Sequence, residues 1–460
     1  MGNSHSYHIF MFPFQWRIPE LAKEVFSDQI DLSKIKFAQA SSWQNVVTPL
    51  TTSEKENLYN EKNYFYEFTH PVLYDTGNDN DVLKHFERRE PASGNVFYNI
   101  GCKDKAYKLN VDAINLNIYS TGIGVLSFYL KNTDYPDAAD VLNINQYGRR
   151  LYPPFFADIE RRIETPYFLE IEGLHGSPLG YREDFKRYTP EMSNVPARFI
   201  EDMIREVATN VTIKSVIDDR MYVMSWYKND EFVNLFKADL GLFKKNEFWY
   251  KYTFVDAGGL TCQNEEMRLS LMDKATYPRW QDSGTLYSVS RYSMQMLTSS
   301  DCPPYLLTYF ETMYVRMAEL VLVQRATLLR FSAEVTNISS LKRKGDSLSK
   351  RVSSLYEEYI RFVNQIHFRE VSAQEQGIEV YNMLYEKACI AKEVDKLDEE
   401  IEELHNHVSL IEDRKNSKLM DWLTLIAAIF LPVTIISGFF GMNVENTSNI
   451  IYSYETLLIV

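Results

Sequence analysis

Two adjacent arginines beside an aromatic ring form the clearest candidate for ligand chemistry in this sequence. Arg149 and Arg150 precede Tyr152 in the stretch QYGRRLYPPF. Paired guanidinium groups can hold a phosphate through charge-assisted hydrogen bonds, and an aromatic ring beside them can stack on a base. The three residues therefore predict a site for a nucleotide-type ligand. The alternative is a solvated pair of surface arginines.

Residues that bind metals or catalyse covalent reactions do not occur at the spacing that such sites need. The eight histidines include no HExxH motif, and His405 and His407 would point to different faces of a helix. The cysteines lack the paired spacing of a zinc site, which favours reduced thiols in a cytosolic domain. They stand at positions 102, 262, 302 and 389. We therefore expect a protein that is not an enzyme.

The acidic composition argues against a nucleic-acid partner. The formal net charge is -14 over 460 residues. A broad nucleic-acid surface needs clustered lysines and arginines, so we expect no direct nucleic-acid partner. The length has room for two to four domains.

One uncharged apolar stretch near the end of the chain has the length of a membrane span. Trp422 to Phe440 comprise 19 residues without a charged side chain. About 20 such residues cross a hydrocarbon core of about 30 Å. Pro432 lies inside the stretch, and membrane helices tolerate proline where neighbours satisfy the backbone. The alternative is a buried helix of a soluble protein.

The charges that flank this stretch predict its orientation. Arg414, Lys415 and Lys418 precede it, and no lysine or arginine occurs from position 419 to 460. The positive-inside rule therefore places the N-terminal bulk of the chain in the cytoplasm. Trp422 stands where an interfacial aromatic anchor belongs.

Apolar residues recur before the span at the 4–3 spacing of a coiled coil. They are Ile390, Val394, Leu397, Ile401, Leu404, Val408 and Ile411. Neither proline nor glycine occurs from Ile378 to Leu431, so we expect one continuous helix of about 60 residues, about 90 Å long. Such a helix cannot bury its seam alone, which predicts a helical hairpin partner or oligomerisation.

The tripeptide Gly441-Met442-Asn443 closes the apolar stretch. In this position, after IFLPVTIISGFF, it resembles the signature of the CorA family of magnesium transporters. The resemblance covers roughly residues 350 to 445, and YIRFVNQIHFREVSAQEQGIEVYNMLYEK looks like the helical hairpin before the family's pore helix. It implies a funnel-shaped homopentamer in the cytoplasmic membrane, in which five first transmembrane helices line the pore and five second helices surround them.

The resemblance also implies the roles of residues at the pore entrance. The amide of Asn443, repeated five times, would meet the hydrated cation, and Gly441 and Met442 complete the motif. Mg²⁺ gives up its waters reluctantly, so a ring of neutral carboxamides can bind the hydrated ion without stripping it. For Asn443 the alternative is a helix C-cap. Glu445 could concentrate cations at the mouth, or it could be a solvated loop carboxylate.

Deeper in the pore, the same matching implies a polar ring at Thr434 and a hydrophobic constriction at Leu431, Leu423 and Met420. Rings of leucine and methionine can gate a pore by dewetting. For Thr434 the alternative is a hydrogen bond to the carbonyl one turn earlier.

Carboxylates on the helix before the span could sense cytosolic Mg²⁺, as in family members that close when Mg²⁺ rises. They include Asp395, Asp398 and Glu402. The alternative is an acidic coiled-coil surface.

The chain before residue 304 is expected to be mixed α and β. The expected fold class is therefore α+β, with long helices that form a stalk and run into a pore helix. Strand-like SYHIFMFPFQW opens the chain, hairpins are expected around Ser120-Thr121-Gly122 and across Asp218-Asp219, and RFIEDMIREVA is helical by periodicity. Pro303-Pro304 marks a break before a long helix.

Four segments follow from these boundaries. They are a cytosolic regulatory domain at 1–303, a helical stalk at 304–420, the first transmembrane pore helix at 421–443, and an extracytoplasmic loop with the start of a second transmembrane helix at 444–460. The CorA family has two transmembrane helices, and this chain ends 17 residues after Asn443. We therefore expect a truncated sequence of a multi-pass protein.

A second resemblance concerns regulation. The segments YHIFMFPFQW and INQYGRRLYPPF are similar to CorA-like effectors associated with type III CRISPR systems. This implies an antiviral channel gated by an adenine-nucleotide messenger, an adenylated S-adenosylmethionine. One alternative is an ordinary Mg²⁺, Co²⁺ or Zn²⁺ homeostasis transporter gated by intracellular Mg²⁺. Another is a membrane-anchored adaptor that transports nothing.

Overall fold

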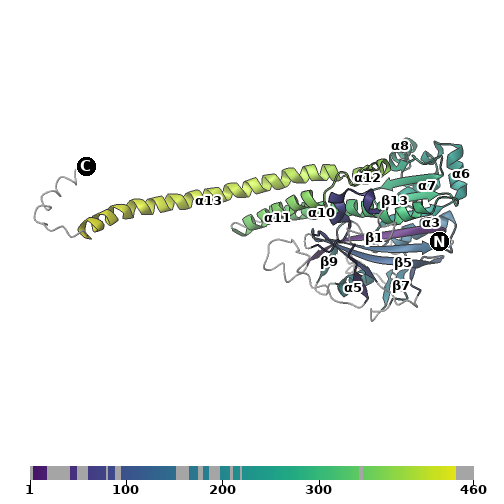
Figure 1. Cartoon of the computed structure of the whole chain (residues 1–460), viewed down its shortest axis with the longest axis horizontal. Helices are drawn as coiled ribbons and strands as arrows, with labels where there is room; N and C mark the ends of the chain where they lie inside the picture. Colours follow the sequence, from purple (N-terminus) through teal and green to yellow (C-terminus); the bar gives the residue numbers. More distant parts are fainter. Residues whose placement is uncertain are drawn as a thin grey trace, which may run out of the picture.

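The protein consists of a sheet domain and a set of long helices, one of which extends far beyond the rest (Figure 1). The computed structural model describes residues 4–17, 42–48, 61–78, 81–88, 95–151, 165–174, 180–185, 197–207, 211–217, 220–340 and 346–441. The sheet domain comprises the described residues up to position 303. The stalk comprises the helices that follow.

The described strands form one continuous sheet in the order β11-β12-β13-β10-β1-β6-β5-β4-β7-β8, with β2, β3 and β9 attached at its sides. All pairs are antiparallel except β10 with β13. The strands are β1 Ser6–Arg17, β2 Trp43–Asn45, β3 Leu83–Arg88, β4 Phe97–Gly101, β5 Ala106–Tyr119, β6 Ile123–Asn132, β7 Phe168–Glu172, β8 Tyr181–Asp184, β9 Thr212–Ser215, β10 Tyr222–Lys228, β11 Thr276–Tyr277, β12 Thr285–Ser290 and β13 Ser293–Thr298.

Strand β1 lies at the centre of the sheet and is apolar on both faces. Ile9 and Met11 belong to the core shared with the stalk helices, whereas Phe10 and Phe12 belong to a second core on the other face. Successive side chains of a strand alternate between faces, so an uninterrupted apolar run is what a doubly covered strand needs. The predicted strand SYHIFMFPFQW is confirmed.

One of the two predicted hairpins is present. β5 and β6 pair around the turn at Ser120-Thr121-Gly122, where Gly122 has a φ of 74° that glycine adopts without strain. The predicted hairpin across positions 218 and 219 is wrong, because β9 and β10 both pair with β1 instead of with each other. At 12 residues, β1 is long enough to pair with both along one edge.

Shorter helices cover the sheet. They are η3 Glu67–Thr69, α2 His70–Leu73, α3 Ala138–Gly148, α5 Arg198–Val207, α6 Asp230–Ala238, η6 Leu242–Lys244, α7 Glu247–Phe254 and α8 Glu265–Ala275. The predicted helix RFIEDMIREVA is confirmed as α5, whose apolar side packs into the second core.

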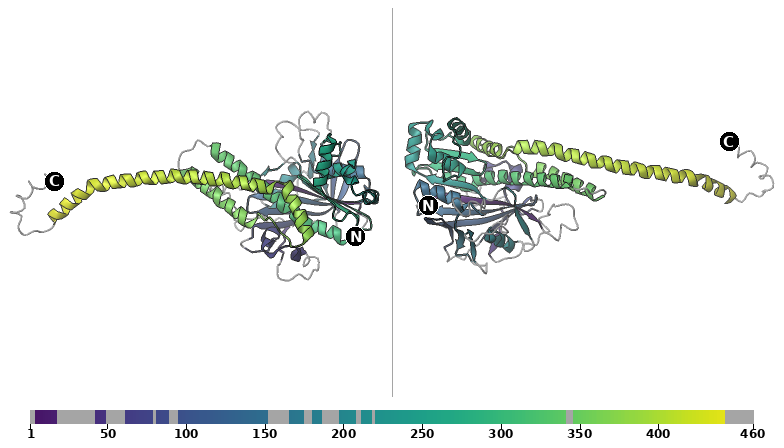
Figure 2. Two further views of the ribbon diagram at one scale, coloured as in Figure 1. Left: turned by 90° about the horizontal axis from the view of Figure 1, so that it is seen from above. Right: turned by 180° about the vertical axis from the view of Figure 1, so that it is seen from behind.

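The stalk helices are α9 Tyr305–Tyr309, a π-helical turn η7 Phe310–Tyr314, α10 Val315–Ser340, α11 Asp346–Gln365, α12 Glu375–Lys387 and α13 Ile390–Gly441. α9 begins directly after Pro303-Pro304, as predicted. α10 packs both on the sheet and against α11 and α13 (Figure 2), so it joins the two parts of the molecule.

The predicted 60-residue helix is divided. α12 ends at Lys387, Cys389 adopts the left-handed conformation with a φ of 59°, and α13 starts at Ile390. The backbone groups of Cys389 at the break are hydrogen-bonded within the chain. The Cys389 amide donates to the Glu386 carbonyl at 3.0 Å, and the Glu393 amide donates to the Cys389 carbonyl at 3.2 Å. It lets α12 rest on the sheet while α13 follows α11.

The apolar seam of α13 is confirmed and finds its partner within the chain. Ile390, Val394, Leu397, Ile401 and Val408 are buried against the stalk helices. Leu404 is half-buried and Ile411 is 45% exposed, since the α10–α11 pair ends near this point of the seam. α11 is thus the hairpin partner that the seam predicted; the alternative, oligomerisation, remains a prediction.

Candidate ion pathway and ligand sites

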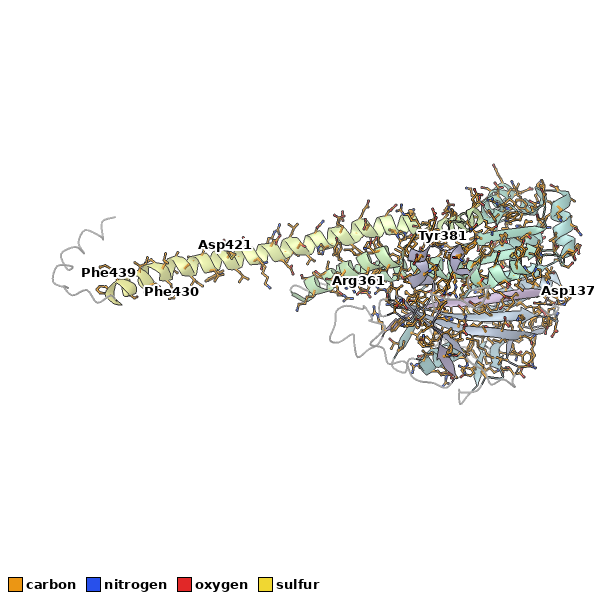
Figure 3. The ribbon with its side chains drawn as sticks, viewed as in Figure 1. Asp137, Arg361, Tyr381, Asp421, Phe430 and Phe439 are labelled. Carbon is orange, nitrogen blue, oxygen red and sulfur yellow. The ribbon has the colours of Figure 1, made fainter. Side chains whose placement is uncertain are left out.

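The last part of α13 is an apolar helix that projects away from the molecule. Every described side chain from Leu410 to Gly441 is exposed. Figure 3 shows Asp421, Phe430 and Phe439 along this projection, with no other element beside them. Among the described residues, α13 is the one helix long and apolar enough to cross a membrane. An exposed apolar surface of this length needs lipid or neighbouring helices to cover it.

The four residues predicted to line the pore share one face of this helix. They are Met420, Leu423, Leu431 and Thr434. At about 100° per residue they fall within an arc of about 80°. Gly441 falls at the edge of the same arc. Because α13 is one continuous helix over this range, these residues lie along one side of it.

Small residues occupy the positions on this face between the predicted pore-lining residues. Ala427 and Gly438 lie between the predicted pore-lining residues along the same arc. Thr434 donates a hydrogen bond from Oγ1 to the Phe430 carbonyl at 2.8 Å. That bond is the alternative considered for Thr434, and it still leaves the hydroxyl oxygen able to accept from water. Small and weakly polar residues are the types that allow close approach of membrane helices.

The opposite face carries large apolar side chains. Trp422, Ile429, Val433, Ile436 and Phe440 fall within about 60° of one another on that side. Each of them is exposed in the single chain, from 55% to 67%. The first face combines leucine and methionine with small residues and Thr434, whereas the second face is bulky throughout, which suits lipid or an outer ring of helices.

The rest of the predicted entrance lies outside the described residues. Gly441 is the last residue of α13, and Met442, Asn443 and Glu445 follow it. Tyr152 of the predicted ligand site also lies outside the described part. Their roles remain predictions.

The predicted arginine pair is buried. Arg149 and Arg150 follow α3 and are 3% and 2% exposed, so the alternative of a solvated surface pair is wrong. Arg149 donates from Nη2 to the Val255 carbonyl at 2.8 Å. The backbone of Arg150 forms an antiparallel bridge with Arg220, just before β10. Their role in ligand binding remains a prediction.

Further arginines continue from this pair toward the stalk. Two guanidinium groups lie near the ring of Tyr292, that of Arg220 at 5.3 Å and that of Arg325 at 5.0 Å from its centre. Arg325 belongs to α10 and donates to the Arg291 carbonyl at 3.1 Å. Sequence reasoning missed this row because its members come from separate segments of the chain.

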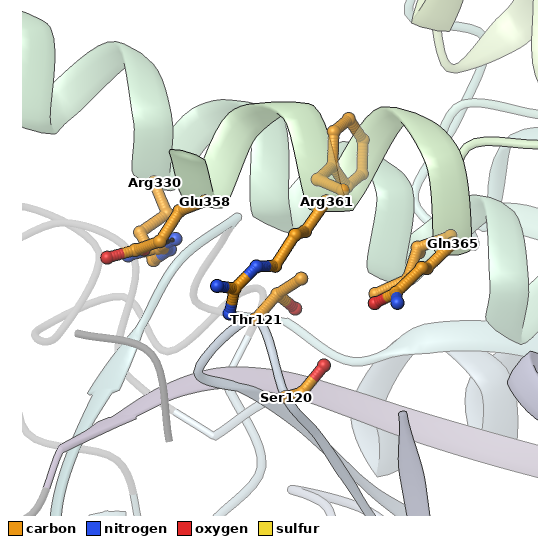
Figure 4. A pocket seen from close by; sticks show the side chains of 8 residues that line it. Ser120, Thr121, Arg330, Glu358, Arg361 and Gln365 are labelled. Atoms are coloured by element: carbon orange, nitrogen blue, oxygen red, sulfur yellow. Dashed lines mark hydrogen bonds and ion pairs between the residues drawn. The ribbon is translucent and has the colours of Figure 1, made fainter. Parts of the chain in front are cut away.

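The turn of the β5–β6 hairpin meets the stalk at a small polar cavity (Figure 4). Arg330 of α10 forms an ion pair with Glu358 of α11 at 2.8 Å, with both side chains almost fully buried. Arg361 extends from α11 into the same cavity, which Ser120 and Thr121 also line. The Thr327 hydroxyl donates to that of Thr121 at 3.2 Å. The sheet is therefore in direct contact with both stalk helices.

A buried polar network anchors the first part of α10 to the sheet. The Glu319 carboxylate accepts hydrogen bonds from Asn117 at 2.5 Å and from the Tyr119 hydroxyl at 2.9 Å, both on β5. Arg316 forms an ion pair with Glu61 and donates to the Leu73 carbonyl at 2.7 Å. Burial raises the pKa of Glu319 above its ordinary value. α10 is held by directional contacts that a shift of the sheet would disturb.

The carboxylates predicted to sense Mg²⁺ are exposed along α13. They are Asp395, Asp398 and Glu402. Within the described part of the chain, no three His, Cys, Asp or Glu side chains are grouped so that they could hold a metal ion. His405 stacks on Tyr356 at 4.4 Å between ring centres, which is a packing role. Cation sensing by this surface remains a prediction.

A comparison with family models identifies the C-terminal part of the chain. Residues 333–460 match the model described as CorA-like Mg²⁺ transporter protein. The match begins within α10 and includes α11, α12 and α13, so it covers the apolar helix and its stalk and leaves the sheet domain outside. This segment is thus similar to a family of membrane transporters for divalent cations. No curated protein matches the chain.

Proposed function

We propose that this chain is the pore-forming subunit of a Mg²⁺ channel or transporter in the cytoplasmic membrane, opened and closed by its sheet domain. The observation that carries the proposal is the match to Mg²⁺ transporters, which coincides with the exposed apolar section of α13 and its two-sided character. An adaptor anchored by a single span would need no face on which Ala427, Thr434 and Gly438 are aligned.

Several copies must combine to make a pathway. One α13 helix encloses no space, and its predicted pore-lining face would be in lipid if the chain acted alone. A homopentamer, as the CorA resemblance implies, places five such faces around one axis. Arg414, Lys415 and Lys418 at the start of the span put the sheet domain in the cytoplasm.

The chemistry of the pathway follows from its side chains. A ring of Asn443 amides selects a hydrated divalent cation at the entrance, with Gly441 and Met442 completing the motif. Thr434 offers a polar ring below it. Rings of leucine and methionine make the constriction, which conducts only when it is wet.

Two kinds of signal are candidates for opening and closing the pore. The buried residues Arg149, Arg150 and Arg325 favour an anionic ligand, in keeping with an adenine-nucleotide messenger and a type III CRISPR-associated antiviral role. Gating by intracellular Mg²⁺ in an ordinary homeostasis transporter is the second candidate. It relies on the exposed carboxylates of α13, such as Asp398.

The proposal is tested by Mg²⁺ entry into dye-loaded proteoliposomes that carry the full-length protein. Asn443→Ala should reduce the flux at least tenfold, whereas Asn446→Ala, an amide three residues further on, should leave it unchanged. Flux that stops as the Mg²⁺ concentration rises on the side of the sheet domain supports an ordinary homeostasis transporter. Flux that requires a nucleotide supports a CRISPR-associated effector. Equal flux in both variants would refute the assignment of Asn443 to the pore entrance.

A further inference from the structure

The lysines and arginines of α13 are confined to one side of the helix. There are five of them, at Lys392, Lys396, Arg414, Lys415 and Lys418. At about 100° per residue they fall within an arc of about 140°, and the predicted pore-lining face lies outside that arc. The three carboxylates predicted to sense Mg²⁺ fall on the pore-lining side instead. A pathway for cations repels positive charge, so the basic side of α13 faces away from it.

Three residues of the basic side are aligned at the start of the apolar stretch. Arg414, Lys418 and Trp422 are spaced by four residues, so on a continuous helix they lie one above the next. All three side chains are exposed. We call these three residues the interfacial ridge. Trp422 is also part of the bulky apolar face, so the ridge continues directly into the surface that suits lipid.

The stalk hairpin contacts α13 on a different side at this level. Ser349, in the first part of α11, donates from its hydroxyl to the Glu412 carboxylate. Glu412 lies about 140° around the helix from the midpoint of Arg414 and Lys418. Two positive charges one helical turn apart repel each other, so an anion bound between them is stabilising.

The position of the ridge along α13 matches the headgroup layer of a bilayer. A bilayer is about 40–45 Å thick and its hydrocarbon core about 30 Å, which leaves about 5–8 Å for the headgroups on each side. With Trp422 at the edge of the core, Lys418 is about 6 Å and Arg414 about 12 Å away from that edge along the helix. Lys418 is therefore at the level of the phosphates, and Arg414 is within a Debye length of about 8–10 Å of them.

The charge at this level favours an anionic headgroup over a zwitterionic one. On this side of the helix, the three basic residues that precede the span outnumber one carboxylate, Asp421. Glu412 and Asp413 lie about 120–140° from the midpoint of Arg414 and Lys418. The chain as a whole has a net charge of -14, so attraction to an anionic surface has to come from a local group of cations.

We propose that the interfacial ridge binds the headgroup of an anionic phospholipid in the cytoplasmic leaflet. Arg414 and Lys418 hold the headgroup phosphate through charge-assisted hydrogen bonds, and Trp422 packs beside the upper part of the acyl chains. The inference rests on the proposed function in one respect, because it requires that α13 crosses the membrane. It does not require that the protein conducts ions.

The binding is tested by the quenching of Trp422 fluorescence with brominated lipids. The full-length protein is reconstituted into phosphatidylcholine vesicles that contain equal amounts of either brominated phosphatidylglycerol or brominated phosphatidylcholine. The chain has six tryptophans, and the other five stand at or before position 280, in the sheet domain. Quenching from the bilayer therefore reports on Trp422, and Trp422→Phe should lose it. In the wild type, phosphatidylglycerol should bind about tenfold or more tightly than phosphatidylcholine.

Two double variants decide whether the ridge causes that preference. A lysine or arginine near an anionic surface strengthens binding about fivefold, so Arg414→Gln with Lys418→Gln should remove most of the preference. Lys392→Gln with Lys396→Gln removes two charges from the same side of the same helix. These two lysines are about 45 and 39 Å from Trp422, far beyond a Debye length, so this control should keep the wild-type preference.

Equal quenching of the wild type by the two lipids, or a preference that the Arg414 and Lys418 double variant keeps, would overturn the lipid site. Absence of quenching by either lipid would also overturn it, because a neighbouring helix would then cover the ridge. Mg²⁺ flux is measured in the same vesicles. Flux without a lipid preference would overturn this inference and leave the proposed function intact, whereas a lipid preference without flux would do the reverse.

Discussion

Glu311 is a carboxyl group placed where its charge is disfavoured. It lies in the π-helical turn η7 between the sheet and α10. Burial, followed by the nearby charge of Asp112, raises the pKa of Glu311 to about 7. The unfolded chain has an ordinary value near 4.5, so the folded protein binds the extra proton between these values. The stability that this group contributes is therefore present below about pH 4.5 and lost as the pH rises through about 7.

Replacing this carboxyl should remove the pH dependence. Glu311→Gln is expected to raise the thermal midpoint of the full-length protein in detergent at pH 8, by the equivalent of up to about 3 kcal/mol. At pH 4, where Glu311 is largely protonated in both the folded and the unfolded chain, the same variant should match the wild type. An equal shift at both pH values would show that the effect is packing and not charge.

The ion pair between Arg330 and Glu358 is the residue-scale contact that ties α10 to α11. Both side chains are nearly inaccessible to water, at 2% and 9% exposure. Removing one partner of a buried pair costs about 3–5 kcal/mol, because the other charge stays buried. Glu358→Ala should therefore lower the thermal midpoint strongly, whereas Glu357→Ala, its exposed neighbour, should change it little. Similar midpoints for both variants would contradict this assignment.

At the scale of elements, local sequence patterns predicted individual strands, turns and helices, but they did not predict which strands pair. The strand β1, the turn around Gly122 and the 4–3 seam of α13 all appear as expected, because each is encoded in a short local stretch of the sequence. The pairing of β9 and β10 could not be predicted, since it depends on the distant strand β1. The break at Cys389 was missed because neither glycine nor proline marks it.

The conformation of Cys389 makes a prediction about that break. Glycine adopts positive φ without strain, whereas a β-branched residue resists it. Cys389→Gly is expected to keep or slightly raise the thermal midpoint, and Cys389→Val to lower it by the equivalent of about 1–2 kcal/mol. Should the valine variant be as stable as the glycine variant, the junction is not fixed in the left-handed conformation.

At the scale of the whole molecule, α10 connects the sheet domain to α13 (Figure 1). The long apolar helix could be predicted from the sequence, because it is encoded in one continuous segment, whereas the pore-lining role of one of its faces remains a prediction. The arginine row could be predicted only at Arg149 and Arg150. Arg220, Arg291 and Arg325 join the row through strand pairing and the packing of α10, which no local pattern records.

We propose that one face of α13 lines a Mg²⁺ pathway and that the opposite face does not. Leu431 and Ile429 are close in the sequence and similarly exposed, at 62% and 59%, but they lie on opposite faces. Each is replaced by cysteine in the full-length protein, and Mg²⁺ flux into proteoliposomes is measured before and after a water-soluble thiol reagent. The wild type, with its four native cysteines, sets the baseline.

We expect the reagent to block flux through Leu431→Cys and to leave flux through Ile429→Cys at the wild-type level. Block of Ile429→Cys with Leu431→Cys unaffected would contradict this expectation, and the pore would have to be assigned to the bulky face of the helix.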